Sequence, residues 1–132
     1  MTVAEQHTAP HIGSGHVKVL ATPVMVILME TAALKAVDGL LPEGYQTVGT
    51  RIDVRHFAAT PVGMRVMASA EVIKIDGRSI TFYLIVEDEK EQIGEGSHER
   101  IIINVARFDQ RIREKLIIRA AKVTGKHKDE IV

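Results

Sequence analysis

The sequence predicts a single α+β domain in which one long apolar helix lies against an antiparallel sheet. Two observations support this prediction. An apolar run over residues 23–34 directly follows a strong helix start, and after Pro42 apolar residues alternate with polar ones as they do in strands. The chain has 132 residues, a length that fits one domain with a core of its own.

The helix is predicted to begin at Thr22 and Pro23, because a hydroxyl residue at the N-cap followed by proline is a common helix start. It should run to Val37 or Asp38, where a glycine and then a proline end it. Its first two turns offer no clean polar face, so we expect a buried helix. Residues 16–21, just before it, alternate and predict a short strand.

After the helix, four strands are predicted over residues 47–57, 64–75, 78–87 and 93–105. Turn sequences separate them, and the strongest is Asp76-Gly77, a typical hairpin signal. We expect the strands to form an antiparallel meander with one face on the helix. From Ala106 the pattern becomes helical again, with Phe108 and Ile112 on one apolar stripe.

A long central helix wrapped by a curved antiparallel sheet is the hotdog arrangement. Within it we assign residues 1–15 to a flexible, loosely held N-terminal arm, 16–105 to the hotdog domain, and 106–132 to a C-terminal helix and a tail whose last residues fray. A sheet this small leaves an edge strand that invites pairing with a second copy. We therefore expect a homodimer, with pairing of dimers into a tetramer left open.

Composition excludes several classes of function. Seventeen basic residues balance seventeen acidic ones, so no net charge attracts nucleic acid or an anionic membrane. The absence of cysteine excludes disulfides and thiolate nucleophiles. The most apolar run is too short to span a bilayer, and the N-terminal residues show no secretory pattern, which favours a cytoplasmic protein. The histidines lack metal-ligand spacing, and no phosphate loop or serine-hydrolase motif is present, so we expect no metal and no cofactor.

Glu30 is the most informative polar residue, because it lies two turns into a helix that should be buried. A lone buried carboxylate is costly unless it has partners. It therefore indicates a general base or nucleophile in a water-poor pocket. A helix with one wet side shared with Lys35 and Asp38 explains the residue equally well.

His56 and Thr22 are the next candidates. Alternation places His56 on the strand face that meets the helix, where it could shuttle a proton, although a satisfied core histidine is the more common case. Thr22 is expected to cap the helix, whose N-terminus also stabilises anions. Eight residues of helix rise about 12 Å, so Thr22 and Glu30 should not meet within one chain. A joint site then needs a second copy of the chain or a non-helical first turn, and we favour a site at the subunit interface.

Glycines and an arginine within the strands complete the candidates. Gly49 could offer its N–H to an acyl carbonyl, although a plain bulge is the more common reason for a strand glycine. Arg100 shares a strand face with His98, Gly94 and Gly96. Its guanidinium could bind phosphate or pantetheine oxygens or pair with a carboxylate, and an exposed ion pair is the alternative.

Several short motifs in series resemble one known family. They are the runs 19–23 (VLATP), 28–33 (LMETAA), 47–50 (TVGT), 56–63 (HFAATPVG), 76–78 (DGR) and 94–100 (GEGSHER). Over roughly residues 13–115, and in the same order, this pattern resembles the hotdog thioesterases related to fluoroacetyl-CoA thioesterase.

The resemblance implies a dimeric enzyme that hydrolyses an acyl-CoA thioester to a free acid and CoA. It implies that Thr22, Glu30 and His56 are catalytic and that Gly49 and Arg100 bind substrate. The fluoroacetyl-specific enzyme has an aromatic-rich segment before the helix, whereas residues 13–19 here contain no aromatic side chain. This difference favours a general short-chain acyl group. Non-catalytic acyl-CoA binding or sensing and enoyl-CoA hydration are the alternatives, and a purely structural protein is the least favoured.

Overall fold

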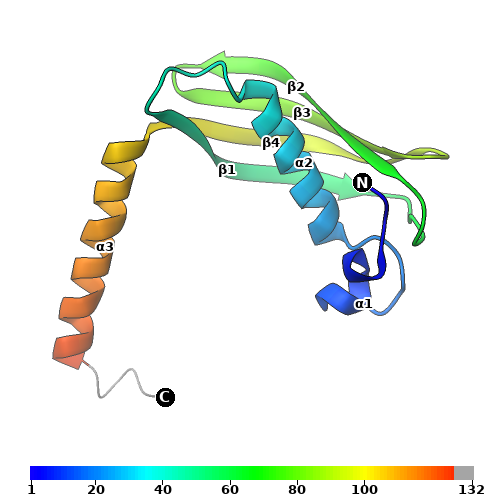
Figure 1. Ribbon diagram of the computed structural model, residues 1–132, viewed down its shortest axis with the longest axis horizontal. Coiled ribbons are helices and arrows are strands. Elements are labelled where there is room, and N and C mark those ends of the chain that lie inside the picture. Colours follow the sequence, from blue (N-terminus) through cyan, green and yellow to red (C-terminus); the bar gives the residue numbers. More distant parts are fainter. Residues whose placement is uncertain (127–132) are drawn as a thin grey trace.

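The structure, a computed structural model, describes residues 1–126 of the chain. A 3₁₀ turn and a short helix come first, then the long helix, four strands and a C-terminal helix (Figure 1). Their bounds are η1 Glu5–His7, α1 Ala9–Ile12, α2 Thr22–Val37, β1 Tyr45–His56, β2 Val66–Asp76, β3 Ser79–Asp88, β4 Gln92–Asn104 and α3 Val105–Lys126. The tail beyond residue 126, with its predicted fraying, lies outside the described residues.

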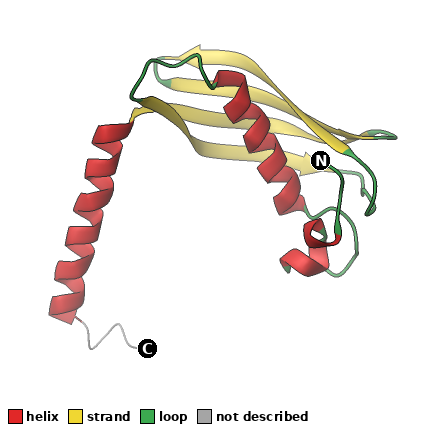
Figure 2. Ribbon diagram, viewed as in Figure 1, coloured by secondary structure: helices red, strands yellow, loops and turns green. Residues whose placement is uncertain are grey.

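The four strands form one antiparallel sheet that curves over α2, which confirms the predicted α+β hotdog arrangement (Figures 1 and 2). The predicted meander is wrong for one strand. The sheet order is β1-β4-β3-β2, so β2, β3 and β4 form a meander while β1 pairs with β4. Tight turns join the meander strands, whereas residues 57–65 connect the two opposite edges. An alternating pattern predicts a strand's faces and says nothing of its neighbours.

Helix α2 packs one side against the sheet. Met25, Met29 and Ala33 are fully buried there, against Phe82, Leu84 and other apolar side chains of β3. The opposite side is open in the single chain. Ile27, for example, is 61% exposed. The prediction of a helix buried all round is therefore wrong for one chain, because a single sheet face can cover only one side of a helix.

Gly94 of β4 allows α2 to approach the sheet closely. A Cβ atom at this position would lie 2.6 Å from the Met25 sulfur, which is closer than real contacts allow. The strand glycine thus marks a close approach between elements, one of the predicted reasons for its presence.

Residues 1–15 do not form the predicted loosely held arm. Val3 and Thr8 are each 1% exposed, so both are part of the packed body. Val3 donates a backbone hydrogen bond to Met64, and Val66 of β2 donates one to Met1. These contacts cover the start of the β2 edge, and an apolar residue at position 3 anchors them. The buried side chains and backbone hydrogen bonds are enough to hold a segment whose composition is typical of a loop.

Two smaller expectations also change. Residues 16–21 form no strand and make only isolated bridges, from Val19 to Pro61 and from Leu20 to Thr8. The β2–β3 hairpin loop comprises residues 77 and 78, one position later than predicted, with Gly77 at a positive φ of 60°. Glycine at the first loop position, followed by a residue with negative φ, is typical of a type II′ turn.

Helix α3 leaves the sheet at the end of β4 and points away from the body (Figure 1). Ile112 and Leu116 of its apolar stripe are exposed along it. Within residues 1–126, no helix combines the length and apolar character needed to cross a membrane.

Candidate active site

The predicted site residues of α2 lie on the flank of the helix that faces β1. Thr22, Val26 and Glu30 follow one another at intervals of four residues, which places them in one row along the helix. The two ends of this row meet the sheet at different places. Thr22 contacts His56 at the end of β1, and Glu30 lies beside Gly49 near its start.

Thr22 and His56 form a direct pair. The Thr22 Oγ1 lies 2.8 Å from the His56 Nδ1, a hydrogen-bond distance. The prediction that Thr22 caps the helix is wrong: Ala21 is the N-cap, Thr22 is the first helical residue, and no side chain makes a cap hydrogen bond. The hydroxyl is instead held by the histidine, which lies on the helix-facing side of β1 as its alternation predicted.

The second ring nitrogen of His56 is left free. Its Nε2 is buried and has no hydrogen-bond partner among the described residues. Burial lowers the pKa of His56 below its usual value of 6.5, and the backbone of Ala58 opposes this effect more weakly. The ring is therefore neutral at neutral pH and can accept a proton from a hydroxyl or a water molecule.

A cavity of about 390 Å³ lies over this pair. Thr22, His56 and Phe57 line it together with the segment that precedes α2; the other lining residues are Ala9, Ser14, Gly15, His16, Val17, Val19, Leu20, Ala21, Ala58 and Ala59. The pair thus borders a space of the size that small-molecule sites usually have.

Glu30 of α2 belongs to a second polar group, whose other members lie on β1 and β4. Its Oε2 lies 3.8 Å from the Arg100 Nη1, an ion pair in which the arginine side chain is 8% exposed and the glutamate 45%. Burial lowers the pKa of Arg100, an effect that the charges of Glu30 and Asp38 oppose. Glu30 therefore has an ionic partner and a half-exposed side chain, and its role as a base or nucleophile stays a prediction.

Arg100 is fixed by groups that the sequence interpretation did not identify. Its Nε donates to the Thr47 Oγ1 at 2.9 Å and its Nη2 to the Thr47 carbonyl at 3.0 Å. Its Nη1 lies 3.2 Å from the His98 Nε2. The period of two put His98 and Arg100 on one face, but no signal in the sequence placed Thr47 opposite them. The alternative of an exposed ion pair is excluded for Arg100.

Gly49 lies at the centre of this second group. A Cβ atom there would lie 3.1 Å from the Glu30 Oε2, 3.2 Å from the His98 Cε1 and 3.4 Å from the Arg100 Nη1. The strand register shifts between Gly49 and Arg51, so a bulge follows the glycine as well. The position thus combines a bulge with a close approach, and its N–H as an acyl-carbonyl donor stays a prediction.

Within one chain, the two groups remain separate. No hydrogen bond or ion pair of the described residues joins Thr22 or His56 to Glu30 or Arg100. This agrees with the rise of about 12 Å expected over eight helical residues. We also find, within residues 1–126, no cluster of three histidine or carboxylate side chains that could hold a metal ion.

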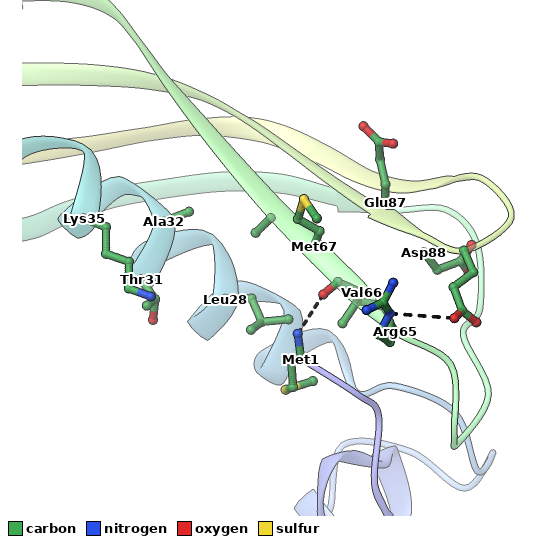
Figure 3. Close-up of a pocket in the computed structure, with 12 residues that line it drawn as sticks. Met1, Leu28, Thr31, Ala32, Lys35, Arg65, Val66, Met67, Glu87 and Asp88 are labelled. Carbon is green, nitrogen blue, oxygen red and sulfur yellow. Dashed lines mark hydrogen bonds and ion pairs between the residues drawn. The ribbon is translucent and has the colours of Figure 1, made fainter.

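A larger cavity, of about 440 Å³, lies on the opposite flank of α2, between the helix and β2 (Figure 3). Leu28, Ala32 and Val66 line it, with Lys35 and Arg65 at its rim. It contains none of the predicted site residues and no histidine, so its size alone does not make it a catalytic site.

The comparisons with known proteins decide the family. A family model described as fluoroacetyl-CoA-specific thioesterase matches residues 3–106. The chain belongs to this family. The fluoroacetyl-CoA thioesterase of Streptantibioticus cattleyicolor is 39% identical over 98 residues, which cover 74% of this chain and 70% of that protein. The sequence-based assignment to the hotdog thioesterases is thereby confirmed.

Solved structures agree with this assignment. The fluoroacetyl-CoA thioesterase FlK has a TM-score of 0.81 and 34% identity, over 87% of this chain and 90% of that one. A thioesterase-superfamily protein of Thermus thermophilus has a TM-score of 0.85 and 29% identity, over 92% and 90%. A hot-dog-like protein of Thermanaerovibrio acidaminovorans, 22% identical with a TM-score of 0.81 over 87% and 85%, supports the fold. The family match ends at residue 106, so most of α3 lies beyond it.

Proposed function

We propose that this member of the thioesterase family hydrolyses short-chain acyl-CoA thioesters to a free acid and CoA, using Thr22, His56 and Glu30. The observation that supports this best is the Thr22–His56 hydrogen bond beneath a cavity, with the second histidine nitrogen unpaired. A hydroxyl held by a neutral histidine is the arrangement that proton transfer requires. The relative named above, a fluoroacetyl-CoA thioesterase, has an activity of the same class.

In the proposed reaction, the thioester carbonyl lies at the subunit interface, near the N-terminus of α2 of one copy and the Gly49 amide of the other, whose dipoles stabilise the oxyanion. Glu30 either attacks the carbonyl, giving a mixed anhydride that water then hydrolyses, or activates the water directly. The attacking water supplies the proton, which passes through Glu30 or directly to His56, and His56 transfers it to the thiolate of CoA. Thr22 orients the water or carboxylate, and Arg100 binds substrate oxygens beside Glu30.

A site shared by two copies of the chain would bring these groups together. Strand β1 is an edge strand, paired only with β4 among the described residues, while residues 1–3 cover the start of the β2 edge. Ile27 of α2 and Ile52 of β1 are exposed on the single chain, beside the half-exposed Glu30. A second copy on the β1 edge would cover apolar surface and could bring its Glu30 to the Thr22–His56 pair.

The cavity lining supports a proposal for the acyl group of the substrate. Residues 13–19 contribute no aromatic side chain, and Phe57 is the one aromatic residue among those that line the cavity over the pair. We therefore propose a general short-chain acyl group instead of a fluorinated one. We place the enzyme in the cytoplasm, as a dimer or as a tetramer of two dimers.

Free-thiol release from a panel of short and medium acyl-CoA thioesters tests the function. The Glu30→Gln protein is measured alongside, with Lys35→Gln as a matched change on the other flank of α2. We expect release with the wild type and Lys35→Gln, and release lowered at least about 100-fold with Glu30→Gln. Full turnover by Glu30→Gln would contradict the proposed role of this residue. Binding of CoA esters without release would indicate a binding module, and loss of crotonyl-CoA absorbance a hydratase.

A further inference from the structure

His98 is a buried polar residue to which the proposed reaction assigns no role. It lies in β4 on the side that faces the helix, two residues before Arg100, and is 2% exposed. Its ring stacks on Phe82, with 6.0 Å between the ring centroids. A buried ring with two polar nitrogens costs stability unless both are hydrogen-bonded, and here both have partners.

These partners fix the hydrogen on the ring. The Nδ1 lies 2.7 Å from the carbonyl oxygen of Arg51, which can only accept, so Nδ1 carries the hydrogen. The Nε2 lies 3.2 Å from the Arg100 Nη1, which can only donate, so Nε2 is the acceptor. His98 is therefore a neutral ring in its Nδ1–H form. Its hydrogen bonds connect the β1 backbone to the guanidinium.

The consequence is a fixed arginine. Thr47 accepts from the Nε and Nη2 of Arg100, and His98 accepts from its Nη1, so all three nitrogens are held. The Nη1 then lies 3.8 Å from the Glu30 Oε2, which is too long for a direct hydrogen bond. The guanidinium therefore faces the Glu30 carboxylate as an ion pair without a direct hydrogen bond to it.

We propose that His98 is a positioning residue that sets the place of Arg100 and, through it, of the Glu30 carboxylate. This inference rests on the proposed catalytic role of Glu30. A histidine that only fills the core would need its ring shape and its stacking on Phe82, but not the acceptor at Nε2. A variant that keeps the bulk of the ring but removes the Nε2 acceptor therefore distinguishes the positioning role from a role in filling the core.

The test compares His98→Phe, which keeps an aromatic ring, with His98→Gln, whose amide can both donate to the Arg51 carbonyl and accept from Arg100. Ser97→Ala, on the outer face of β4, is the control. We expect His98→Phe to lower kcat about 10- to 100-fold with KM changed less than about threefold, since small misplacements of catalytic groups have effects of this size. His98→Gln should recover most of the loss, and Ser97→Ala should behave as wild type.

A double variant separates the possible failures. In the Glu30→Gln background, His98→Phe should cause no further loss of the residual rate, because both changes act through one carboxylate. The inference is overturned if Glu30→Gln lowers kcat while His98→Phe leaves kcat unchanged, if the Phe and Gln variants of His98 act alike, or if the two losses multiply. Full turnover by Glu30→Gln overturns the proposed function itself, and this inference with it.

A spectroscopic measurement on the unaltered protein needs no variant to fold. Two-dimensional ¹⁵N–¹H NMR of the histidine rings distinguishes the Nδ1–H form from the Nε2–H form. We expect His98 in the neutral Nδ1–H form, assigned by its loss in His98→Gln. An Nε2–H form or a doubly protonated ring would contradict the acceptor role.

Discussion

The two polar groups on the β1 flank of α2 differ in how completely they are hydrogen-bonded. The Thr22–His56 pair borders a cavity and keeps one buried ring nitrogen without a partner. The group of Glu30, Arg100, His98 and Thr47 includes two buried side chains in which every nitrogen has a partner. An unpaired nitrogen suits a group that accepts a proton. A group in which each nitrogen has a hydrogen-bond partner suits one that holds a charge in place. Within the single chain, the pair proposed to transfer a proton is thus separate from the group proposed to hold a charge.

The largest expected effect on activity comes from inactivating each polar group in a separate variant and then combining the two variants in mixed dimers. His56→Ala and Glu30→Gln should each lower kcat/KM at least about 100-fold, the usual minimum for a proton-transfer group. If one copy supplies Thr22 and His56 and the other supplies Glu30, a mixed dimer has one intact site. Equal mixing should restore about one quarter of wild-type activity in the thiol-release assay.

The control for this experiment mixes each variant with itself after the same dissociation and reassembly. Sedimentation must show that the subunits exchange. If the subunits exchange and no thiol release returns, the Thr22–His56 pair and Glu30 act within one chain. The site shared by two copies would then be rejected.

Removing the Thr22 hydroxyl should have the next largest effect. Thr22→Val keeps the shape of the side chain but cannot hydrogen-bond the His56 Nδ1, so we expect about a 10- to 100-fold loss of kcat. Thr22→Ser retains the hydroxyl and should recover most of it. Because Ala21 and not Thr22 is the N-cap, neither change should alter the melting temperature by more than a few degrees. Equal activity of the Val and Ser variants would contradict a role for the hydroxyl.

Gly49→Ala probes the polar group around Arg100 without removing any of its members. The new methyl group would lie 3.1 to 3.4 Å from Glu30, His98 and Arg100, which must each shift by a few tenths of an ångström. We expect about a tenfold loss of kcat with little loss of stability. In Gly94→Ala the new methyl group would lie 2.6 Å from the Met25 sulfur. We expect this variant to lose stability more than activity, with a clearly lower melting temperature. Thermal unfolding and thiol release on both variants make the comparison.

Patterns in the sequence were sufficient to predict the long helix α2, the four strands, the C-terminal helix and the inward faces of the site residues on β1 and β4. Alternation placed His56 and Arg100 towards the helix, and the Thr22-Pro23 start located α2. The motifs that resemble the thioesterase family pointed to the same residues. These are local properties, with periods of two and 3.6 residues, and the structure confirms them.

Long-range pairing was beyond those patterns. Thr47 meets Arg100 only because β1 pairs with β4, in a register that shifts between Gly49 and Arg51. No local pattern encodes a pairing between residues 53 positions apart. The same limitation explains the wrong strand order and the role given to Thr22, whose hydroxyl is held by a residue 34 positions away.

The pH dependence follows from the lowered pKa of His56. Because burial favours its neutral form, the acid limb of kcat/KM should have its midpoint below the usual histidine value of 6.5. The stability contribution has a matching sign: it is complete above pH 6.5 and is lost as the pH falls through the lowered pKa, since the unfolded chain binds the proton more readily. A rate profile from pH 5 to 8, with His56→Gln as the control for stability, tests both. An acid limb above 6.5 would contradict this assignment.

The smallest effect is expected on the opposite flank of α2. Arg65 borders the larger cavity, whose lining includes no member of either polar group, and makes an exposed ion pair of 3.9 Å with Glu89 (Figure 3). Exposed pairs of this kind contribute at most about 1 kcal/mol, and often nothing measurable. Arg65→Ala should therefore change the free energy of unfolding by less than about 1 kcal/mol and kcat/KM by less than about twofold. A larger loss of activity would mean that the β2 flank takes part in substrate binding, and that the chemistry is not confined to the side of the helix facing β1.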